Sequence, residues 1–513
     1  MVDGKILIEK LIKYAEKFLY LEKMDEEYFR NLLLKELNVE TPFTGEEDFP
    51  CVEKLSVPDE LADELIVYAK ENSVCPEGEE ELFSAHILGL LTPRPSKINE
   101  EFFRLRAEKG IYSACEYLYS VSVMNRYVRK TDIEKNLKWE FEDGDNVLEI
   151  TVNLSKPEKD NKDIAKLLSL KNTGENYPAC ALCKENEGFK GNLKKPPRSN
   201  LRTVTVTLGG EEWFVQYSPY AYYTEHCIAI NRKHSNMCIG DKTCDKLFDF
   251  VDIFPNYFIG SNADLPIVGG SILNHEHFQG GGHVLPMRKS PIKQKLVSDK
   301  YPLVSGGVLD WYNSALRFTS KSRESLAGLG AEFIRFWKNY TDEEVNIYAF
   351  KDGKPHSTLS PIASKNGDEY TLELILRNNI TTDEYPDGLF HAHPEYFNIK
   401  KEGIGLIEAM GLFILPGRLK RQTKEIEKIL TGEREYSGEI ASDDDLFVHS
   451  DMIKSLTDKF GVGLTENEAH DRVIDYINQT CKSILECTAV FKKDEKGEKA
   501  FKKCLTSFGF RFE

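Results

Sequence analysis

The spacing of apolar residues changes twice along this chain of 513 residues, and the change restricts the fold more than any other feature. From Ile8 to Leu19 apolar residues recur every three or four positions, which places them on one face of a helix. In the middle of the chain the spacing falls to two, since Val204, Val206 and Leu208 alternate with threonines as in a half-buried strand. Helical spacing returns in about the last 90 residues of the chain. The pattern predicts an α+β protein with helical regions at both ends.

Local signals refine this pattern. A second helix is expected around Leu61 to Ala69, and two prolines between residues 91 and 96 interrupt the helical region. Thr465 and Glu468 have capping-box spacing and precede an apolar stripe that contains Ile477. The polar stretch 155–160 is expected to be an exposed joint before the β-rich part. The expected strands are 204–208, 213–217, 226–230 and 370–376. Turns are expected at 209–210 and 352–353, and a β-like stretch at 346–350 leads into the turn at 352–353.

Charge and cysteine content exclude several classes of protein. The formal net charge is −17, which disfavours a general binder of nucleic acid or anionic membranes but permits a nucleotide-sized ligand. Neither a signal peptide nor a long apolar segment is visible, so a membrane partner is not expected. The 11 cysteines are odd in number and scattered, which is typical of the reducing cytoplasm rather than of a disulfide framework.

The segment 268–283 has the highest density of residues that can carry chemistry. His275, His277 and Gln279 lie two apart, so in an extended strand they share one face. Such a row offers a metal ligand, a nucleophile or base, and an amide donor for an anionic oxygen. Three glycines at 280–282 leave the neighbouring backbone N–H groups unhindered. The alternative is a polar strand whose histidines have no role.

Two cysteines have the spacing of half a zinc site. Cys180 and Cys183 follow Pro178 in a turn-like stretch, and two further ligands would have to come from elsewhere. The downstream candidates are His226, His234 and His275. Buried free thiols are the alternative, whereas a redox pair is less favoured because no βαβ pattern surrounds the motif.

Arg198, Asn200 and Arg202 lie two apart on the way into a strand, where guanidinium groups could hold phosphates. Ordinary surface arginines are the alternative. A P-loop and a dinucleotide-binding glycine motif in strand–helix context are both missing, which disfavours P-loop NTPases and Rossmann dehydrogenases.

Seven segments, spread over most of the chain, match one known family: 91–96, 148–159, 177–188, 216–220, 225–227, 273–280 and 404–408. Taken together they resemble the galactose-1-phosphate uridylyltransferase family in its second bacterial class. The resemblance implies membership of the histidine-triad superfamily and a fold of two related α+β halves, in agreement with the second H-x-H pair at His391 and His393. It implies a mainly helical region 1–165, a first half with the nucleophile at 166–340, a second half at 341–425 and a helical region at 426–513.

The resemblance implies exchange of a uridylyl group between UDP-glucose and galactose 1-phosphate, giving UDP-galactose and glucose 1-phosphate. His277 is then the nucleophile that carries the uridylyl group, with ping-pong kinetics, and Gln279 contacts the transferred phosphoryl group. Gly270 and Ser271 correspond to further phosphate contacts, and Glu408 to a glutamate that binds sugar hydroxyls. The uracil-contacting pair of the first class has no counterpart near Ser218 and Pro219.

The resemblance also implies a structural zinc ion on Cys180, Cys183, His234 and His275. A second metal site of the first class uses histidines that correspond to His391, His393 and His356. Its carboxylate ligand does not carry over, because Met287 and Arg288 stand in its place, and this argues against a second metal here. Members of the family are commonly homodimers.

Two rival functions differ from this expectation. Another histidine-triad nucleotidyltransferase or a dinucleotide phosphorylase would form different products from UDP-glucose and galactose 1-phosphate. A non-catalytic, zinc-stabilised binder of sugar nucleotides would keep its affinity after replacement of His277 by alanine and would show no turnover.

Overall fold

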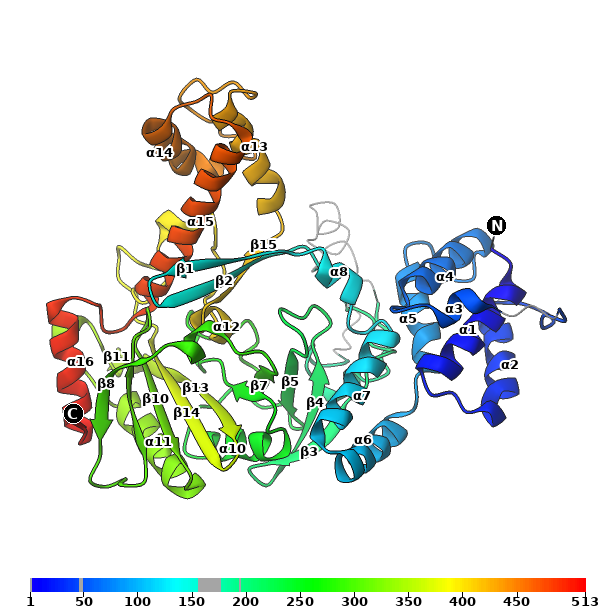
Figure 1. The fold of residues 1–513 in the computed structure, drawn as a ribbon, viewed down its shortest axis with the longest axis horizontal. Helices are drawn as coiled ribbons and strands as arrows, with labels where there is room; N and C mark the ends of the chain where they lie inside the picture. Colours follow the sequence, from blue (N-terminus) through cyan, green and yellow to red (C-terminus); the bar gives the residue numbers. More distant parts are fainter. Residues whose placement is uncertain (1, 46–48, 156–176, 193–194) are drawn as a thin grey trace. The chain divides into compact units, whose positions relative to one another are not determined.

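The structure is a computed structural model that describes residues 2–45, 49–155, 177–192 and 195–513 (Figure 1). It contains two compact units, one of residues 1–135 and 155–235 and the other of residues 136–154 and 236–513. The expected joint at 155–160 and the boundary at 165–166 fall almost wholly outside the described residues. The four-part division of the chain stays a prediction.

Helices make up most of the described residues between 2 and 135 of the first unit. Asp3 caps helix α1 (Gly4–Phe18) by accepting hydrogen bonds from the backbone N–H groups of Lys5 and Ile6. The apolar face of α1 is buried, as its spacing predicts, and it packs with apolar residues of the following helices. The other helices are α2 (Glu26–Glu36), α3 (Pro50–Glu53), α4 (Asp59–Asn72), α5 (Glu80–Leu91), α6 (Pro95–Lys109), α7 (Ile111–Met124) and α8 (Lys130–Glu134).

Three antiparallel strands complete the first unit, and the sequence predicted all of them. Strands β3 (Val204–Leu208) and β4 (Glu211–Tyr217) form a hairpin in which Val204 lies opposite Val215. The turn between them has φ values of 60° at Gly209 and 78° at Gly210, which explains the glycine pair. Strand β5 (Cys227–Asn231) pairs with β4.

The second unit contains eight strands in the order β16-β8-β9-β10-β14-β13-β6-β7, and every described pairing between them is antiparallel. A smaller sheet of order β1-β2-β15 belongs to the same unit. These strands are β1 (Leu137–Asp143), β2 (Asn146–Asn153), β6 (Phe258–Gly260), β7 (His277–Gly281), β8 (Ile292–Val297), β9 (Ser305–Leu309), β10 (Ala315–Ser320), β13 (Ser357–Asn366), β14 (Glu369–Asn378), β15 (Leu412–Pro416) and β16 (Arg511–Phe512).

The two faces of the larger sheet have different surroundings. Helices α10 (Thr243–Ile253) and α11 (Arg323–Lys338) pack on one face, where a Cβ atom at Gly330 would lie only 2.7 Å from the Leu372 side chain. Because side chains alternate along a strand, Glu373 and Arg377 of β14 point to the opposite face. The short helix α12 (Leu406–Ala409) lies on that opposite face, since a Cβ atom at Gly260 would lie 2.8 Å from Leu406 and 3.0 Å from Ile362.

The C-terminal helices agree with the sequence pattern. Helix α15 (Glu466–Thr488) starts with the predicted capping box, in which Thr465 and Glu468 each bond the other's backbone N–H. The sequence pattern predicts a stripe of Ile474, Ile477, Cys481 and Ile484; the last three are buried and Ile474 is partly buried. The other helices here are α13 (Leu419–Thr431), α14 (Ser450–Phe460) and α16 (Glu495–Phe508).

Two local expectations differ from the structure. The region expected to be mainly helical also contains the hairpin of β1 and β2 at residues 137–153. The stretch 346–350 is mostly irregular, and only Phe350 enters the short strand β11 (Phe350–Lys351), which pairs with β12 (Lys354–Pro355) around the predicted turn. The α+β prediction itself is confirmed. No helix within the described ranges is long and apolar enough to cross a membrane.

Candidate functional site

The first H-x-H segment runs into strand β7, which pairs with β6. His277 is the first residue of β7, and Gln279 lies two residues further on the same face. His275 precedes the strand, so only two of the three residues expected in one row share a strand face.

Close approach of β6 explains one glycine of this segment. A Cβ atom at Gly280 would lie 2.2 Å from the backbone oxygen of Phe258, which is far inside van der Waals contact. Any side chain at Gly280 would therefore push β7 away from β6 and move Gln279, which precedes it.

The register of the sheet shows what shares the face of Gln279. Gln279 lies opposite Gly260, Gly260 opposite Ile362, and Ile362 opposite Glu373. Opposed residues of antiparallel strands point to the same face. The face of His277 and Gln279 is therefore the one that carries Glu373 and the short helix α12.

The His277 side chain has a defined tautomer. Its Nδ1 lies 2.8 Å from the backbone oxygen of His275. A carbonyl oxygen only accepts hydrogen bonds, so Nδ1 carries the proton and Nε2 keeps its lone pair. His277 is buried, with only 6% of its surface exposed. This burial disfavours the charged ring and lowers the pKa of His277 below its usual range.

A buried ion pair fixes the residue between the two histidines. Glu276 is 6% exposed, and both of its carboxylate oxygens accept from Lys246 of α10, at 2.9 and 3.1 Å. Lys246 was not among the sequence-predicted residues. The sequence did indicate that such a partner exists, because the Glu276 carboxylate next to a buried strand requires a cation nearby. It did not indicate which cation.

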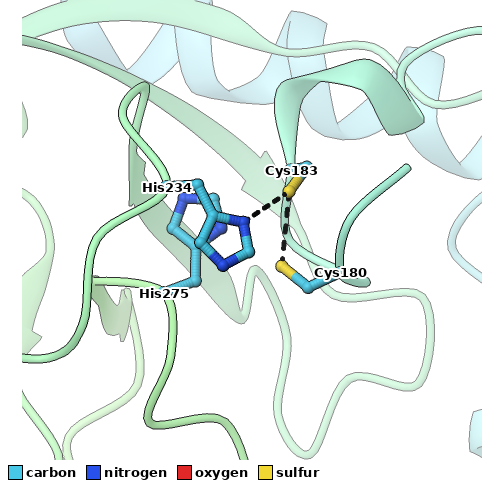
Figure 2. A group of neighbouring side chains, drawn as sticks. All are labelled: Cys180, Cys183, His234 and His275. Carbon is cyan, nitrogen blue, oxygen red and sulfur yellow. Dashed lines mark hydrogen bonds between the residues drawn. The ribbon is translucent and has the colours of Figure 1, made fainter. Parts of the chain in front are cut away.

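The predicted metal ligands come together (Figure 2). Cys180, Cys183, His234 and His275 each offer one ligand atom, and these atoms all lie within 4.8 Å of one another. The Sγ atoms of Cys180 and Cys183 are 3.5 Å apart, and the Cys183 Sγ is 3.1 Å from the His234 Nδ1. Ligands about 2.3 Å from a tetrahedral zinc ion are about 3.7 Å apart, so the donor atoms and their spacing fit zinc.

The loop that carries the two cysteines is held by hydrogen bonds from Leu182 and Asn186. The Leu182 N–H points to the Cys180 Sγ at 3.4 Å. The Asn186 side-chain amide donates to the backbone oxygens of Cys180 and Cys183, both at 2.8 Å. The two thiols are thus placed without help from a disulfide, and none of the 11 cysteines, all of which lie within the described ranges, forms one.

Of the three candidate histidines, His226 does not join this group. It is buried, and its ring packs against Tyr222 and Tyr223, with centroids 5.1 and 4.8 Å away. Spacing along the sequence could not show which of His226 and His234 is the ligand. The two residues lie beyond opposite ends of β5, and the course of that strand decides which of them reaches the cysteines.

Three further predicted contacts lie in the second unit. Gly270 is next to Asn262, whose Nδ2 would be 2.8 Å from a Cβ atom at position 270. Ser271 is exposed. Glu408 of α12 is mostly buried, and its Oε1 is 3.1 Å from the Lys400 Nζ.

Arg202 and Asn200 are engaged by the backbone of the first unit. Asn200 and Asn125 each donate a side-chain amide hydrogen bond to the other's backbone oxygen, at 2.8 and 2.6 Å. The five N–H groups of the Arg202 guanidinium all donate to backbone oxygens, so none remains for a phosphate. These acceptors are Gly89, Thr92, Pro93, Ser199 and Leu201.

Arg198 differs from these two neighbours. Its guanidinium carbon lies 5.4 Å from the centre of the Tyr127 ring, and the residue is only half-buried. It lines a small pocket of about 60 Å³ together with Arg126, Arg129 and Tyr220. Asn200 also lines this pocket, but its side-chain amide donates to the Asn125 backbone oxygen, and Arg202 does not line it.

We expect Arg202→Ala to destabilise the protein by about 3 to 4 kcal/mol, because it leaves several buried carbonyl oxygens without a donor. Arg198→Ala is the matched control and should cost well under 1 kcal/mol. Urea unfolding followed by tryptophan fluorescence measures both. Equal midpoints for the two variants would contradict a structural role for Arg202.

The histidines that correspond to the second metal site of the first class bond other groups of the protein. His356 Nδ1 bonds the Asn379 side chain at 2.8 Å, and His393 Nε2 donates to the Leu389 oxygen at 3.1 Å. His391 Nε2 accepts from the backbone N–H of Ile404 at 3.1 Å. Within the described part of the chain, the Cys/His group above is the one cluster suited to a metal. The residues at this second position do not fit a metal site.

Comparison with known proteins places this chain among named relatives. Two family models match it, galactose-1-phosphate uridyl transferase N-terminal domain over residues 24–236 and C-terminal domain over residues 250–437.

Similar curated proteins share almost the whole length. A galactose-1-phosphate uridylyltransferase of Caldanaerobacter subterraneus subsp. tengcongensis is 44% identical over 99% of both chains. Another, of Fusobacterium nucleatum, is 42% identical over 99% of both chains. Among solved structures, a yeast Ap4A phosphorylase covers 64% of this chain and 89% of its own, at 9% identity and a TM-score of 0.32. The family models and the full-length identities together show that this chain belongs to the galactose-1-phosphate uridylyltransferase family.

Proposed function

We propose that this protein transfers a uridylyl group from UDP-glucose to galactose 1-phosphate through a covalent intermediate on His277. The observation that carries the proposal is the hydrogen bond from His277 Nδ1 to the His275 carbonyl oxygen at 2.8 Å. That bond leaves Nε2 as the unprotonated nitrogen, which is what an imidazole needs in order to attack phosphorus.

The transfer takes place in two displacements. In the first, the His277 Nε2 lone pair forms a bond to the α-phosphorus of UDP-glucose, and glucose 1-phosphate leaves with the electron pair of the broken P–O bond. In the second, a phosphate oxygen of galactose 1-phosphate forms a bond to that phosphorus, and the N–P bond returns its electrons to Nε2. The ring is cationic in the intermediate, and the carbonyl oxygen on Nδ1–H stabilises this charge.

Gln279 is placed to assist both displacements. It follows His277 by two residues on the same face of β7, about 7 Å along the strand. A side-chain amide can donate to a non-bridging oxygen of the phosphoryl group, where negative charge develops. We assign Gln279 this role, and the glycine at 280 maintains its strand position.

The remaining substrate contacts are assigned by their chemistry. Gly270 and Ser271 offer backbone and hydroxyl groups to the phosphates, and Arg198 offers a guanidinium that no carboxylate occupies among the described ion pairs. Glu408 offers a carboxylate to sugar hydroxyls. Asn200 and Arg202 are excluded from this set, because their side chains bond the backbone.

We further propose that the Cys/His group binds one zinc ion with a structural role. Cys180, Cys183, His234 and His275 supply four ligands, which fills a tetrahedral shell and leaves no position for substrate. The group supplies rigidity rather than Lewis acidity. His275 both offers a ligand nitrogen and presents the carbonyl that orients His277, so fixing His275 also fixes the nucleophile. Cysteines that form no disulfide fit a reducing, cytoplasmic location.

Product analysis tests the proposed activity. Purified protein is incubated with UDP-glucose and galactose 1-phosphate, and the products are separated by ion-exchange chromatography. Equal amounts of UDP-galactose and glucose 1-phosphate are expected. A parallel incubation replaces galactose 1-phosphate by inorganic phosphate, and UDP formed only there would identify a phosphorylase instead. Binding of UDP-glucose without turnover in either incubation would identify a sugar-nucleotide binder.

A further inference from the structure

Three buried side chains converge on one short segment of backbone, residues 404–406. The His391 Nε2 accepts from the Ile404 N–H at 3.1 Å, and the Arg377 Nη2 donates to the Ile404 oxygen at 2.8 Å. The Asn262 Oδ1 accepts from the Leu406 N–H at 2.8 Å. We call His391, Arg377 and Asn262 the Ile404 clamp.

The members of the clamp are almost without solvent contact. His391 is 4% exposed, Arg377 1% and Asn262 3%. Hydrogen bonds at such depth have no competing water, and an unpaired group there costs its full desolvation energy. Burial, with a contribution from the nearby Arg377 charge, lowers the pKa of His391 to about 4, so the ring is neutral at pH 7 and can accept.

The clamped segment leads directly into α12, which carries Glu408. Gly405 lies between Asn262 and Glu408, since a Cβ atom at Gly405 would be 3.0 Å from the Asn262 Oδ1 and 3.4 Å from the Glu408 Oε2. The end of α12 is held as well, because Trp311 and Asn313 both donate to the Ala409 oxygen. Both ends of the helix that presents Glu408 are therefore fixed by side chains.

Asn262 also touches the loop that precedes the nucleophile. The Asn262 Nδ2 would be 2.8 Å from a Cβ atom at Gly270, so only glycine allows this approach. One side chain thus contacts both the Gly270 loop and the segment before Glu408.

We infer that the Ile404 clamp positions Glu408 for the hexose of the substrate, and that His391 serves as a hydrogen-bond acceptor in it instead of as a metal ligand. This inference deepens the proposed function and rests on it. His391, Arg377 and Asn262 are positioning residues, since none of them needs to touch the substrate.

The chemistry around His391 supports this use of the second H-x-H pair. The Nε2 lone pair is directed at a backbone N–H, so it is not available to a cation. After burial, the largest influence on the His391 pKa is the positive charge of Arg377, which exceeds the opposite effect of Asp387 and would repel a divalent metal.

Binding of two ligands that differ only in the sugar tests the inference. Calorimetry measures the Kd of UDP-glucose and of UDP in the His277→Ala background, where no uridylyl group can be transferred to the protein, with His391 intact, with His391→Ala and with His391→Gln. Removing the His391 acceptor leaves the buried Ile404 N–H unpaired, and an energy of that size corresponds to about a tenfold change in affinity. We expect His391→Ala to raise the Kd of UDP-glucose about tenfold with little change for UDP, and His391→Gln, whose amide oxygen can accept, to restore most of the difference.

Two further variants keep the test decisive. Asn262→Ala should raise the Kd of UDP-glucose more than that of UDP through the Leu406 N–H, and any loss common to both ligands comes from its contact with the Gly270 loop. This variant covers the case in which His391→Ala fails to fold. His393→Ala, from the same H-x-H pair but outside the clamp, should bind both ligands as wild type does. Metal content by plasma mass spectrometry should be equal in wild type and His391→Gln.

Equal losses for UDP and UDP-glucose in the clamp variants, or a metal equivalent that disappears with His391, would overturn the inference. Neither result bears on whether the wild-type protein forms UDP-galactose. A wild-type protein without uridylyl transfer would instead remove the proposed function, so the two failures are distinguishable.

Discussion

His277→Ala abolishes uridylyl transfer, with an expected loss in kcat of about 10⁵-fold or more, because the variant lacks the atom that forms the covalent intermediate. The side chain is 6% exposed, so the variant also contains a small cavity and is expected to lose about 1 to 2 kcal/mol of stability while remaining folded. Initial rates of galactose 1-phosphate-dependent formation of glucose 1-phosphate measure the effect on activity.

Labelling separates loss of the nucleophile from a general defect. UDP-glucose labelled in the α-phosphate should leave acid-labile, base-stable label on wild-type protein, in a peptide that contains His277. The variant should take up none. The matched control is His470→Ala, a half-exposed histidine of α15 that pairs with Glu427, and it should label as wild type does.

Two kinetic results would contradict this mechanism. Label retained in His277→Ala would assign the nucleophile to another residue. A ping-pong order requires parallel lines in double-reciprocal plots of the initial rate of wild-type protein against one substrate at several fixed concentrations of the other. Intersecting lines would exclude it.

Cys183→Ser is expected to remove the bound zinc and to lower the free energy of unfolding by about 5 kcal/mol or more, since structural zinc contributes directly to folding. Cys183 is buried and is the thiol closest to both Cys180 and His234, at 3.5 and 3.1 Å. A serine hydroxyl is a poor zinc ligand at neutral pH, although its size is nearly the same.

Metal analysis and thermal unfolding measure this prediction together. One zinc per chain is expected in wild-type protein and well under half of that in Cys183→Ser, with a fall in Tm of more than 10 °C. Dialysis of wild-type protein against a strong chelator should reproduce the fall, and added zinc should reverse it. Cys51→Ser, at an exposed thiol, is the control. Zinc-free wild-type protein with unchanged Tm would reject the site.

Much of the local structure could be predicted because it is encoded by nearby residues. The glycine pair at 209–210 predicts the hairpin, because glycine readily adopts the positive φ values that its turn requires. The spacing of Thr465 and Glu468 predicts the start of α15, because their side chains can bond each other's backbone N–H. His277 and Gln279 share a face because they are two residues apart in one strand. These features need no knowledge of the rest of the fold.

Other assignments depended on partners that are far away in the sequence. Arg202 looks like a phosphate ligand beside Arg198, but its guanidinium is used by carbonyl oxygens as distant as Gly89. His391 looks like a metal ligand beside His393, but its lone pair meets the Ile404 N–H. A side chain's type states what it can bind, whereas its use depends on which groups the fold brings to it.

By itself, the sequence determined the α+β class, the strand that presents His277, and the C-x-x-C half of a metal site, since these depend on periodicity and short spacings. The family resemblance favoured His234 over His226 as a ligand, but spacing alone did not, and the tertiary structure brings His234 to the cysteines while His226 packs against tyrosine rings. Only the tertiary structure decided that Asn262, Arg377 and His391 meet at residues 404–406. The physical reason is that these contacts join residues that are far apart in the sequence and that only sheet pairing and packing bring together. No local sequence pattern encodes which distant residues will meet.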